Sequence, residues 1–307
     1  MFTKVLIWFD KSNVKVADNV GESIGWLRFI PFILMHLLCL LVFVVGWSPV
    51  ALWVALASYL LRMFAITAFY HRYFPHKAFK TSRVCQFLFG VLGATATQRG
   101  PIWWASHHRR HHLYSDKDND IHSPRHGFLW SHIGWFLCLK NFTTREHCVR
   151  DLVKFPELVL LDCFDSLIPI IYAFSMLFLG QYLETAYPEL HTNGPQMVIW
   201  GYFVSSIVLI HRTLLVNSLA HVLGTRRYET GDDSRNNLFI ALFALGEGWH
   251  NNHHHYPVSA DQGFFRWEID ICYYLLRLMS LLGLIWDLKR VPADRLVSNL
   301  IKKMPQS

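Results

Sequence analysis

The stretch 29–61, FIPFILMHLLCLLVFVVGWSPVALWVALASYLL, contains no Asp, Glu, Lys or Arg. Its 33 residues would form a helix of about 50 Å, whereas the hydrocarbon core of a bilayer is about 30 Å thick. One straight span is therefore too long, and Gly46-Trp47-Ser48-Pro49 supplies a turn. The stretch predicts a helical hairpin with membrane spans at about 29–47 and 49–70.

A second apolar pair follows at about 166–183 and 196–215. The connection between them, 184–195, contains two glutamates and no Lys or Arg. Basic residues gather instead on the other side of the four spans, and positive loops face the cytoplasm. The numbers of Lys and Arg are 4 in residues 1–28, 13 in 71–160 and 10 in 217–307. The pattern predicts cytoplasmic N- and C-termini and cytoplasmic regions at 71–160 and 217–307.

The composition also argues for a membrane protein. The chain of 307 residues is 52% hydrophobic and only 17% charged, with a mean hydropathy of +0.23, whereas soluble domains carry about a quarter charged residues. The net charge of +7 does not indicate nucleic-acid binding, because the basic residues are interleaved with apolar spans. The start, MFTKVLIWFDKSNVK, has no long apolar stretch, so we expect no removable signal peptide.

Histidine is unusually abundant, with 18 residues, and most of the predicted chemistry rests on three clusters. These are HRYFPH at 71–76, HHRRHH at 107–112 and HNNHHH at 250–255. Offsets of 0, +3 and +4 place His108, His111 and His112 on one face of a helix. The same offsets recur in the third cluster. Each trio can therefore present its imidazoles to a common point.

The type of ligand atom narrows the choice of metal. Imidazole suits iron, copper, zinc or nickel, whereas Mg²⁺ and Ca²⁺ prefer oxygen ligands. The six cysteines include no CxxC pair, which argues against a closed structural zinc site. Eight or more imidazoles are enough for two metals, and a redox-active pair could activate O₂.

The three clusters, in this order between paired apolar spans, resemble the histidine boxes of membrane fatty-acid desaturases. The similarity is closest to the stearoyl-CoA (Δ9 acyl-CoA) type, and it covers about 60–300. It implies one all-α integral membrane domain over 1–307, with four transmembrane helices and a cytoplasmic His-rich helical cap that holds a dinuclear metal site. It extends over DIHSPRHGFLWSHIGW (120–135), NSLAHVLG (217–224), GEGWHNNHHHYP (246–257) and the segment 267–291.

The resemblance also implies a ligand set, carried over position by position. Asn217 matches a family residue that holds a metal-bound water. His107 and His255 flank the boxes and are left out, while His122 and His132 match positions with supporting or structural roles. The nine implied ligands are His71, His76, His108, His111, His112, His221, His250, His253 and His254.

The implied activity is O₂-dependent desaturation of a long-chain acyl group at two irons, on acyl-CoA and at Δ9. Removing hydrogen from an unactivated alkyl chain requires an O₂-activating metal pair. No GxGxxG loop is present, so we expect a separate electron carrier (ferredoxin, rubredoxin or a cytochrome b5-like protein) and its reductase. The membrane would be the bacterial inner membrane or the endoplasmic reticulum.

Four residues are candidates for substrate contact. Trp104 matches a family position near the acyl chain, although core packing explains it equally well. Arg99, Arg109 and Arg110 are candidates for a phosphate-bearing headgroup. The sequence leaves two alternatives to a desaturase: a membrane di-iron hydroxylase of alkyl or lipid chains, and a His-rich membrane metal transporter or sensor. A transporter would require ionisable residues within several spans, and beyond His36 and Arg62 there are few.

Overall fold

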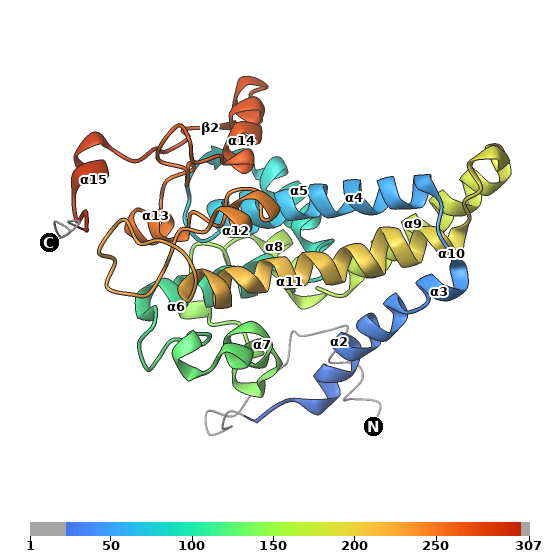
Figure 1. The fold of residues 1–307 in the computed structure, drawn as a ribbon, viewed down its shortest axis with the longest axis horizontal. Helices are drawn as coiled ribbons and strands as arrows, with labels where there is room; N and C mark the ends of the chain where they lie inside the picture. Colours follow the sequence, from blue (N-terminus) through green and yellow to red (C-terminus); the bar gives the residue numbers. More distant parts are fainter. Residues whose placement is uncertain (1–22, 302–307) are drawn as a thin grey trace, which may run out of the picture.

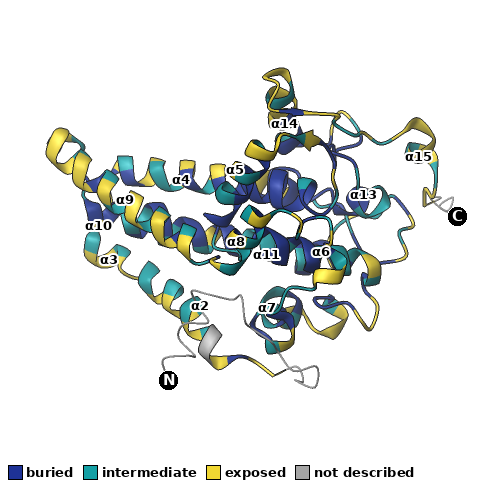
Figure 2. Ribbon diagram, turned by 180° about the vertical axis from the view of Figure 1, so that it is seen from behind, coloured by how far each residue is buried: buried dark blue, intermediate teal, exposed yellow. Residues whose placement is uncertain are grey.

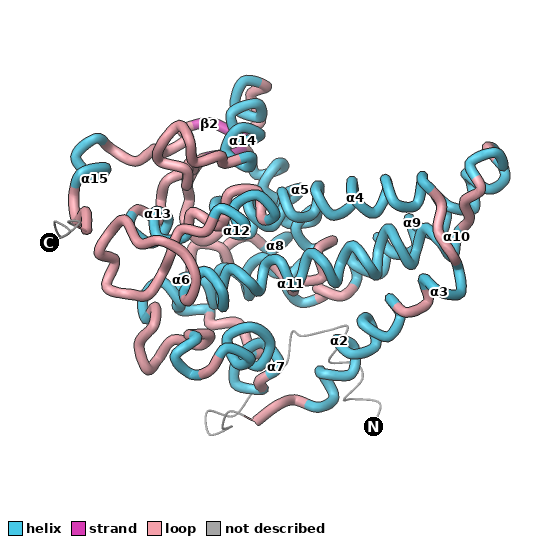
Figure 3. The backbone as a smooth tube through the Cα atoms, in the orientation of Figure 1, coloured by secondary structure: helices cyan, strands magenta, loops and turns pink. Residues whose placement is uncertain are grey.

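A computed structural model describes residues 23–301 and is built almost entirely of helices (Figure 1, Figure 3). The N-terminal segment, with its predicted lack of a signal peptide, lies outside the described residues. The α-helices are α2 (Trp26–Cys39), α3 (Val42–Val45), α4 (Pro49–Phe64), α5 (Arg83–Ala94), α6 (Pro101–Tyr114), α7 (Trp135–Leu137), α8 (Pro156–Cys163), α9 (Leu167–Ala186), α10 (Gly194–Gln196), α11 (Ser205–Ser218), α12 (Leu238–Phe243), α13 (His250–His255), α14 (Ile271–Leu281) and α15 (Ala293–Val297).

Several of these helices are extended by tighter or wider turns. The π-helical segments are η1 (Ala65–Tyr73), η3 (Trp130–Gly134) and η7 (Met197–Val204). The 3-10 turns are η2 (Pro124–His126), η4 (Leu139–Asn141), η5 (Glu146–Cys148), η6 (Pro188–Leu190) and η8 (Leu219–His221). The strands β1 (Lys80–Thr81) and β2 (Ile285–Trp286) pair antiparallel, with Lys80 opposite Trp286.

Three helical segments are long and apolar enough to cross a membrane: Pro49–Tyr73, Leu167–Ala186 and Gly194–His221. They lie side by side in Figure 1 as α4 with η1, α9, and α10 with η7 and α11. The first begins where predicted, because Ser48 Oγ accepts a hydrogen bond from Ala51 N and Pro49 occupies the first turn. Only 11% of the most apolar 18-residue stretch of α9 is buried, so most of this helix presents apolar side chains outward.

The predicted first span, 29–47, does not form one regular α-helix. It forms α2 and α3, with an apolar helical stretch over Phe29–Val45. At Leu40 and Leu41 the backbone hydrogen bonds run to the third preceding residue instead of the fourth, which tightens the turn. The described chain therefore contains three helices that meet the length of a membrane span and one shorter, interrupted helical stretch.

Apart from η6, which connects α9 and α10 at the far end, the remaining elements gather at one end of the long helices, where loops are also most frequent (Figure 3). We call residues 71–160 and 217–301 the cap. Buried residues concentrate in the cap and in the adjoining ends of the long helices, as the dark blue ribbon shows in Figure 2. All three histidine clusters lie in this part of the chain. The core here is aromatic: the rings of Phe69 and Phe89 stack with centroids 3.8 Å apart.

Candidate metal centre

The first histidine cluster is positioned by the π-helical end of a long helix. His71 lies within η1 and is buried, whereas His76 follows the end of that segment and is half-buried. A π-helical turn changes the rotation per residue, and such turns occur often at functional sites. The adjacent Arg72 is fully buried and anchors the segment through hydrogen bonds to Asp270 at 2.8 and 3.1 Å.

The second and third clusters are positioned by buried polar contacts. Helix α6 begins at Pro101, and Asp162 of α8 accepts a hydrogen bond from Trp103 N at 2.8 Å, which satisfies a free N–H in its first turn. In α13, the side chain of Asn251 accepts hydrogen bonds from Tyr228 N and Arg227 N, each at 2.8 Å. The two asparagines of HNNHHH are completely buried and hold the helix rather than face the metal centre.

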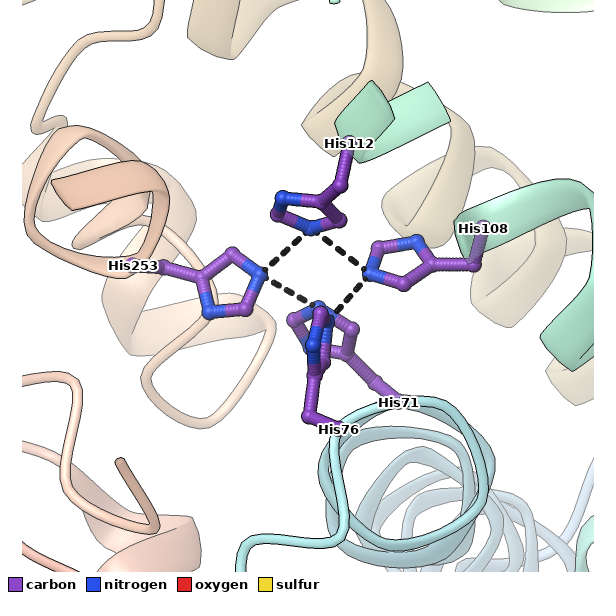
Figure 4. Close-up of side chains that lie close together, drawn as sticks. All are labelled: His71, His76, His108, His112 and His253. Atoms are coloured by element: carbon purple, nitrogen blue, oxygen red, sulfur yellow. Dashed lines mark hydrogen bonds between the residues drawn. The ribbon is translucent and has the colours of Figure 1, made fainter. Parts of the chain in front are cut away.

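Five imidazoles converge in one group, which we call the five-histidine group (Figure 4). His253 Nε2 lies 3.0 Å from Nε2 of both His71 and His112. His108 Nε2 lies 2.8 Å from Nε2 of His76 and 3.0 Å from Nε2 of His112. The rings come from η1, the turn after it, α6 and α13, so three distant segments meet at one point.

Four further imidazoles form a second group, the four-histidine group, made of His111, His221, His250 and His254. One nitrogen of each lies within 4.8 Å of the others, and Nε2 of His221 is 3.0 Å from Nε2 of His250. Nε2 of His111 and Nε2 of His254 are buried and have no hydrogen-bond partner in the described chain. The nine histidines named from the sequence are thus divided five and four.

Carboxylates fix three rings of the four-histidine group. Each of these rings donates from Nδ1 to an aspartate, which leaves Nε2 as an unprotonated acceptor directed at the other rings. The contacts are His111 with Asp120 at 3.1 Å, His221 with Asp116 at 2.7 Å and His254 with Asp232 at 2.7 Å.

The five-histidine group has less support of this kind. His71 Nδ1 contacts the carboxylate of Glu247, and Gln262 Nε2 lies 3.3 Å from Nδ1 of His253. Within residues 23–301, no carboxylate contacts Nδ1 of the other three rings. As whole residues, His76, His108 and His112 are half-buried, whereas His71 and His253 are buried.

Burial keeps most of the imidazoles neutral. It lowers the pKa of His76, His108 and His112 well below the usual value, and the neighbouring imidazoles lower it further. Burial also lowers the pKa of His254 to about 4, against the opposing effect of Asp232. At His111 burial acts in the same direction, but the Asp120 carboxylate outweighs it and raises the pKa. Neutral imidazole is the form that binds metals.

The residues of both groups fit metal ions. Ligands about 2.1 Å from one ion and at right angles to each other lie about 3 Å apart, which is the spacing of the Nε2 atoms in the five-histidine group. The four Nε2–Nε2 contacts run from His76 through His108, His112 and His253 to His71, and they cannot all be hydrogen bonds because each N–H serves one acceptor. In the four-histidine group, Nε2 of His111 and Nε2 of His254 are buried acceptors without a hydrogen-bond partner, which also indicates that a metal ion fits there.

Two cavities adjoin the groups. The smaller, of about 30 Å³, is lined by members of both groups, including His71, His108, His111 and His250. The larger, of about 250 Å³, reaches α2 and is mostly apolar. Both cavities are lined by Trp104, His108, Thr213 and Asn217. Asn217, predicted to hold a metal-bound water, therefore lies where the larger cavity meets the histidine groups.

The predicted substrate residues are placed differently from one another. Trp104 stacks on His108 with ring centroids 4.9 Å apart. Arg99 lines the larger cavity and is paired with Asp165. The N–H groups of Arg109 are used by the Asp151 carboxylate and by three backbone carbonyls, which leaves none for a headgroup. Arg110 Nη2 donates to Asn119 O.

The histidines left out of the ligand set lie outside both groups. His107 Nδ1 contacts Trp103 O at 3.0 Å, and His255 stacks on Tyr228, with Nε2 2.7 Å from Arg295 O. His132 belongs to a separate chain of imidazoles that leads away from the cap. Its members are His132, His211 and His36, with nitrogen separations of 3.0 and 2.9 Å.

Five supporting residues are absent from the sequence prediction. They contact the imidazoles from behind. The four acidic ones gave a usable signal in the sequence, because they follow the second cluster in DKDND, precede the third in GEGWH and occur in GDD, whereas the glutamine gave none. Spacing could not assign each to a ring, because the pairs are far apart in sequence. The residues are Asp116, Asp120, Asp232, Glu247 and Gln262.

Comparison with known proteins agrees with this geometry. The family model described as "Fatty acid desaturase" matches residues 45–284. The chain is 36% identical to "Delta-9 acyl-lipid desaturase 2" of Arabidopsis thaliana, over 90% of this chain and 86% of that protein. It is 35% identical to "Acyl-CoA 5-desaturase AL21" of Anemone leveillei, over 93% and 88%. It is 34% identical to "sn-1 stearoyl-lipid 9-desaturase" of Anabaena variabilis, over 89% and 97%.

Proposed function

The chain belongs to the fatty acid desaturase family and is a fatty acyl desaturase, and on this premise we propose that it inserts a cis double bond at Δ9 of a long acyl chain with O₂ as the oxidant. One observation carries the proposal: an apolar cavity ends at the place where nine imidazoles converge in two groups. An extended alkyl chain in this cavity would bring its methylene groups to the histidines.

The nine histidines would hold two irons, one in each group, with Asn217 directed to a bound water. When bound, the irons would supply the oxidant that an unactivated C–H bond requires. The protein contributes positioning. Carboxylates orient the imidazoles, Trp104 and Thr213 line the route of the acyl chain, and the apolar wall keeps water away from the reacting carbons.

The overall reaction requires an electron source. Removing two hydrogens from the chain while reducing one O₂ to two waters consumes two further electrons and two protons. We propose that a separate carrier (ferredoxin, rubredoxin or a cytochrome b5-like protein), reduced by its own reductase, delivers them. We propose that the electrons enter on the side of the five-histidine group, where the residues His76, His108 and His112 are half-buried.

The positions of the helix ends support a membrane arrangement. The N-terminal ends of α2 and α9 and the C-terminal ends of η1 and α11 lie toward the cap (Figure 1). We propose that α2 with α3 completes a set of four spans, and that the cap and both termini are cytoplasmic. The residues that expose apolar side chains on α9 would contact lipid.

The acyl carrier is the less determined part of the proposal. Two of the named relatives act on acyl lipids and one on acyl-CoA. We propose acyl-CoA, as the similarity to the stearoyl-CoA type implies. The family assignment favours a desaturase over both alternatives, the hydroxylase and the metal transporter or sensor.

The proposal is tested in cells that lack unsaturated-fatty-acid synthesis and express this chain. Total fatty acids are analysed by gas chromatography with localisation of double bonds, with and without O₂. We expect new cis-monoenes, mainly Δ9, that appear only with oxygen. Hydroxylated chains would instead indicate the hydroxylase. Unchanged lipids, in cells that contain the iron-loaded protein and a reductase, would refute the proposed activity.

A further inference from the structure

The wall of the larger cavity contains three buried polar atoms that have no hydrogen-bond partner among the described residues. They are Trp135 Nε1, His107 Nε2 and His122 Nδ1. For His122 Nδ1, the Asp120 carboxylate lies 4.0 Å away, beyond hydrogen-bond distance. The residues of the three atoms are 7%, 2% and 4% exposed, so bulk water does not compensate these atoms. A buried N–H or ring nitrogen without a partner is unfavourable, and a site on a cavity wall is where a ligand could supply the missing contact.

The three residues form one continuous patch. The rings of Trp135 and His122 have centroids 5.0 Å apart, and those of Trp135 and His107 are 6.2 Å apart. Trp103 packs against both Trp135 and His107, at 5.9 and 4.4 Å. The rest of the cavity lining near this patch is largely apolar, including Phe136 and Leu137. Gln98 and Thr213, which also line the cavity, hydrogen-bond to each other at 2.9 Å. Among the described lining residues, the buried polar atoms without a hydrogen-bond partner therefore lie in this patch.

The types of atom define the group that would bind. Trp135 Nε1–H can only donate, so the ligand must provide an acceptor. His107 Nδ1 donates to Trp103 O, so its Nε2 is an acceptor and can receive a donor beside that group. The nearby cation, Arg99, is already paired with Asp165 at 2.6 Å. The patch thus matches an uncharged carbonyl better than a carboxylate or phosphate.

We propose that Trp135 donates a hydrogen bond from Nε1 to the carbonyl oxygen of the acyl linkage, and that this contact sets the position of the chain relative to the histidine groups. The inference rests on the proposed function and adds a positioning residue to it. The carbonyl is shared by the thioester of acyl-CoA and the ester of a glycerolipid. His107 Nε2 would receive the nearby amide N–H of acyl-CoA, or a water beside the ester of a glycerolipid, because that ester has no N–H or O–H of its own.

The patch also has a direct connection to the metal centre. The ring of His122 lies 4.2 Å from the ring of His111, centroid to centroid. A carbonyl held at Trp135 is therefore fixed against the same rigid unit that holds the four-histidine group. Loss of the contact would let the chain slide in the cavity, and the methylene group presented for oxidation would change.

The test uses Trp135→Phe, which removes the N–H and keeps an aromatic ring. Binding of stearoyl-CoA is compared with binding of its thioether analogue, which lacks the carbonyl, using the anaerobic full-length protein. Wild type should bind the thioester about fivefold to tenfold more tightly, and the variant should bind both equally. Ester-linked and ether-linked distearoyl glycerolipids in vesicles provide the same comparison for the lipid carrier.

The matched control is Trp130→Phe. Trp130 Nε1 already donates to Ile121 O at 3.1 Å, so this variant should keep the discrimination between ester and ether. A second readout is the double-bond position: Trp135→Phe should yield monoenes at neighbouring positions, and Trp130→Phe should not. The acyl carrier is identified by the pair of analogues that wild type distinguishes: thioester and thioether for acyl-CoA, or ester and ether for a glycerolipid.

Two results would overturn the inference: equal binding of ester and ether analogues by wild type, or discrimination and product position unchanged in Trp135→Phe. If Trp135→Phe does not fold, as seen from iron content and thermal unfolding, the wild-type comparison of ester with ether remains decisive. A wild-type protein that forms no monoene from either carrier would refute the proposed function instead, and the binding comparison separates the two failures.

Discussion

The two histidine groups differ in how they are supported. Three of the four rings in the four-histidine group are held by aspartates at 2.7–3.1 Å, and three of its members are fully buried. In the five-histidine group the single carboxylate contact is that of Glu247 among the residues described. Three of its residues, His76, His108 and His112, are half-buried.

The difference indicates a division of properties between the two groups. A carboxylate behind an imidazole fixes its tautomer and orientation and makes it a stronger ligand. The four-histidine group, with fewer rings and more carboxylates, therefore forms a rigid, more negative site. The five-histidine group, with more rings and fewer carboxylates, forms a site that is more open and that a metal ion enters more easily. We expect the four-histidine group to retain its iron longer, and the predictions below test this expectation.

The largest effect should come from the imidazoles themselves. His111→Ala and His253→Ala each remove one ring from one group, and each should abolish desaturation, lowering it more than 100-fold, because the lost ligand has no replacement in the buried centre. The iron content should fall from about two per chain toward one, measured in the purified protein. Both variants should still insert into the membrane.

Full activity in either variant would contradict the ligand assignment for that group. The matched control is His255→Ala. His255 belongs to the same cluster as His253 but stacks on Tyr228 away from both groups, so its removal should leave iron content and activity within about twofold of wild type.

Removing a supporting carboxylate should have a smaller effect. Asp232→Asn leaves His254 in place but removes its acceptor charge, and we expect iron affinity in the four-histidine group and activity to fall about 10–100-fold. Asp233→Asn is the control, because Asp233 pairs instead with Arg125 at the surface. Chelator competition measures iron loss, and equal retention in the two variants would remove the basis for the asymmetry.

The sequence was sufficient to name the nine histidines that the structure brings together, but not for this asymmetry. The spacing in HHRRHH and HNNHHH places the trios on helix faces, and the resemblance supplies His71, His76 and His221; the structure brings all nine together. The sequence could not divide the nine histidines into two groups, because His111 and His112 are adjacent in sequence yet belong to different groups. Their separation depends on the relative orientation of α6 and α13.

Of the fold, the apolar runs predict the long helices well, because hydrophobicity and length decide membrane spans. The tightened turn at Leu40 and Leu41 and the π-helical segment η1 were not predicted, since they arise from packing rather than from composition. The imidazole chain from His36 to His132 was missed for the same reason: its members are far apart in sequence.

Acidification should affect the metal-free protein through the two groups in opposite directions. Burial lowers the pKa of His112, so its contribution to stability is present above about pH 6.5 and is lost as the pH falls. At His111 the Asp120 carboxylate outweighs burial and raises the pKa, so that contribution is present below about pH 6.5 and is lost as the pH rises through the raised value.

Thermal unfolding of metal-free variants between pH 7 and 5 measures this difference. The loss of stability on acidification should be smaller in His112→Asn and larger in His111→Asn than in wild type. Each substitution removes the titration of at most one proton, so it changes the pH dependence of the free energy of unfolding by at most about 1.4 kcal/mol per pH unit. The same slope in both variants would show that the aspartates do not distinguish the two groups.

The smallest effect concerns the segment behind the five-histidine group. Asp261 precedes Gln262, and burial, with a further contribution from Asp270, raises its pKa to about 7. A carboxyl with a raised pKa destabilises the fold increasingly as the pH rises from about 4 to 7. Asp261→Asn should therefore stabilise the protein by about 1–2 kcal/mol at pH 8 and by much less at pH 5. The distant ion pair with Arg290, at 3.6 Å, offsets only part of this gain.

Iron retention by the four-histidine group should not change in Asp261→Asn, because no aspartate of that group contacts this segment. Equal melting temperatures for variant and wild type at pH 8 would show that Asp261 is ionised without penalty, and that the support behind the five-histidine group is more hydrated than its burial indicates.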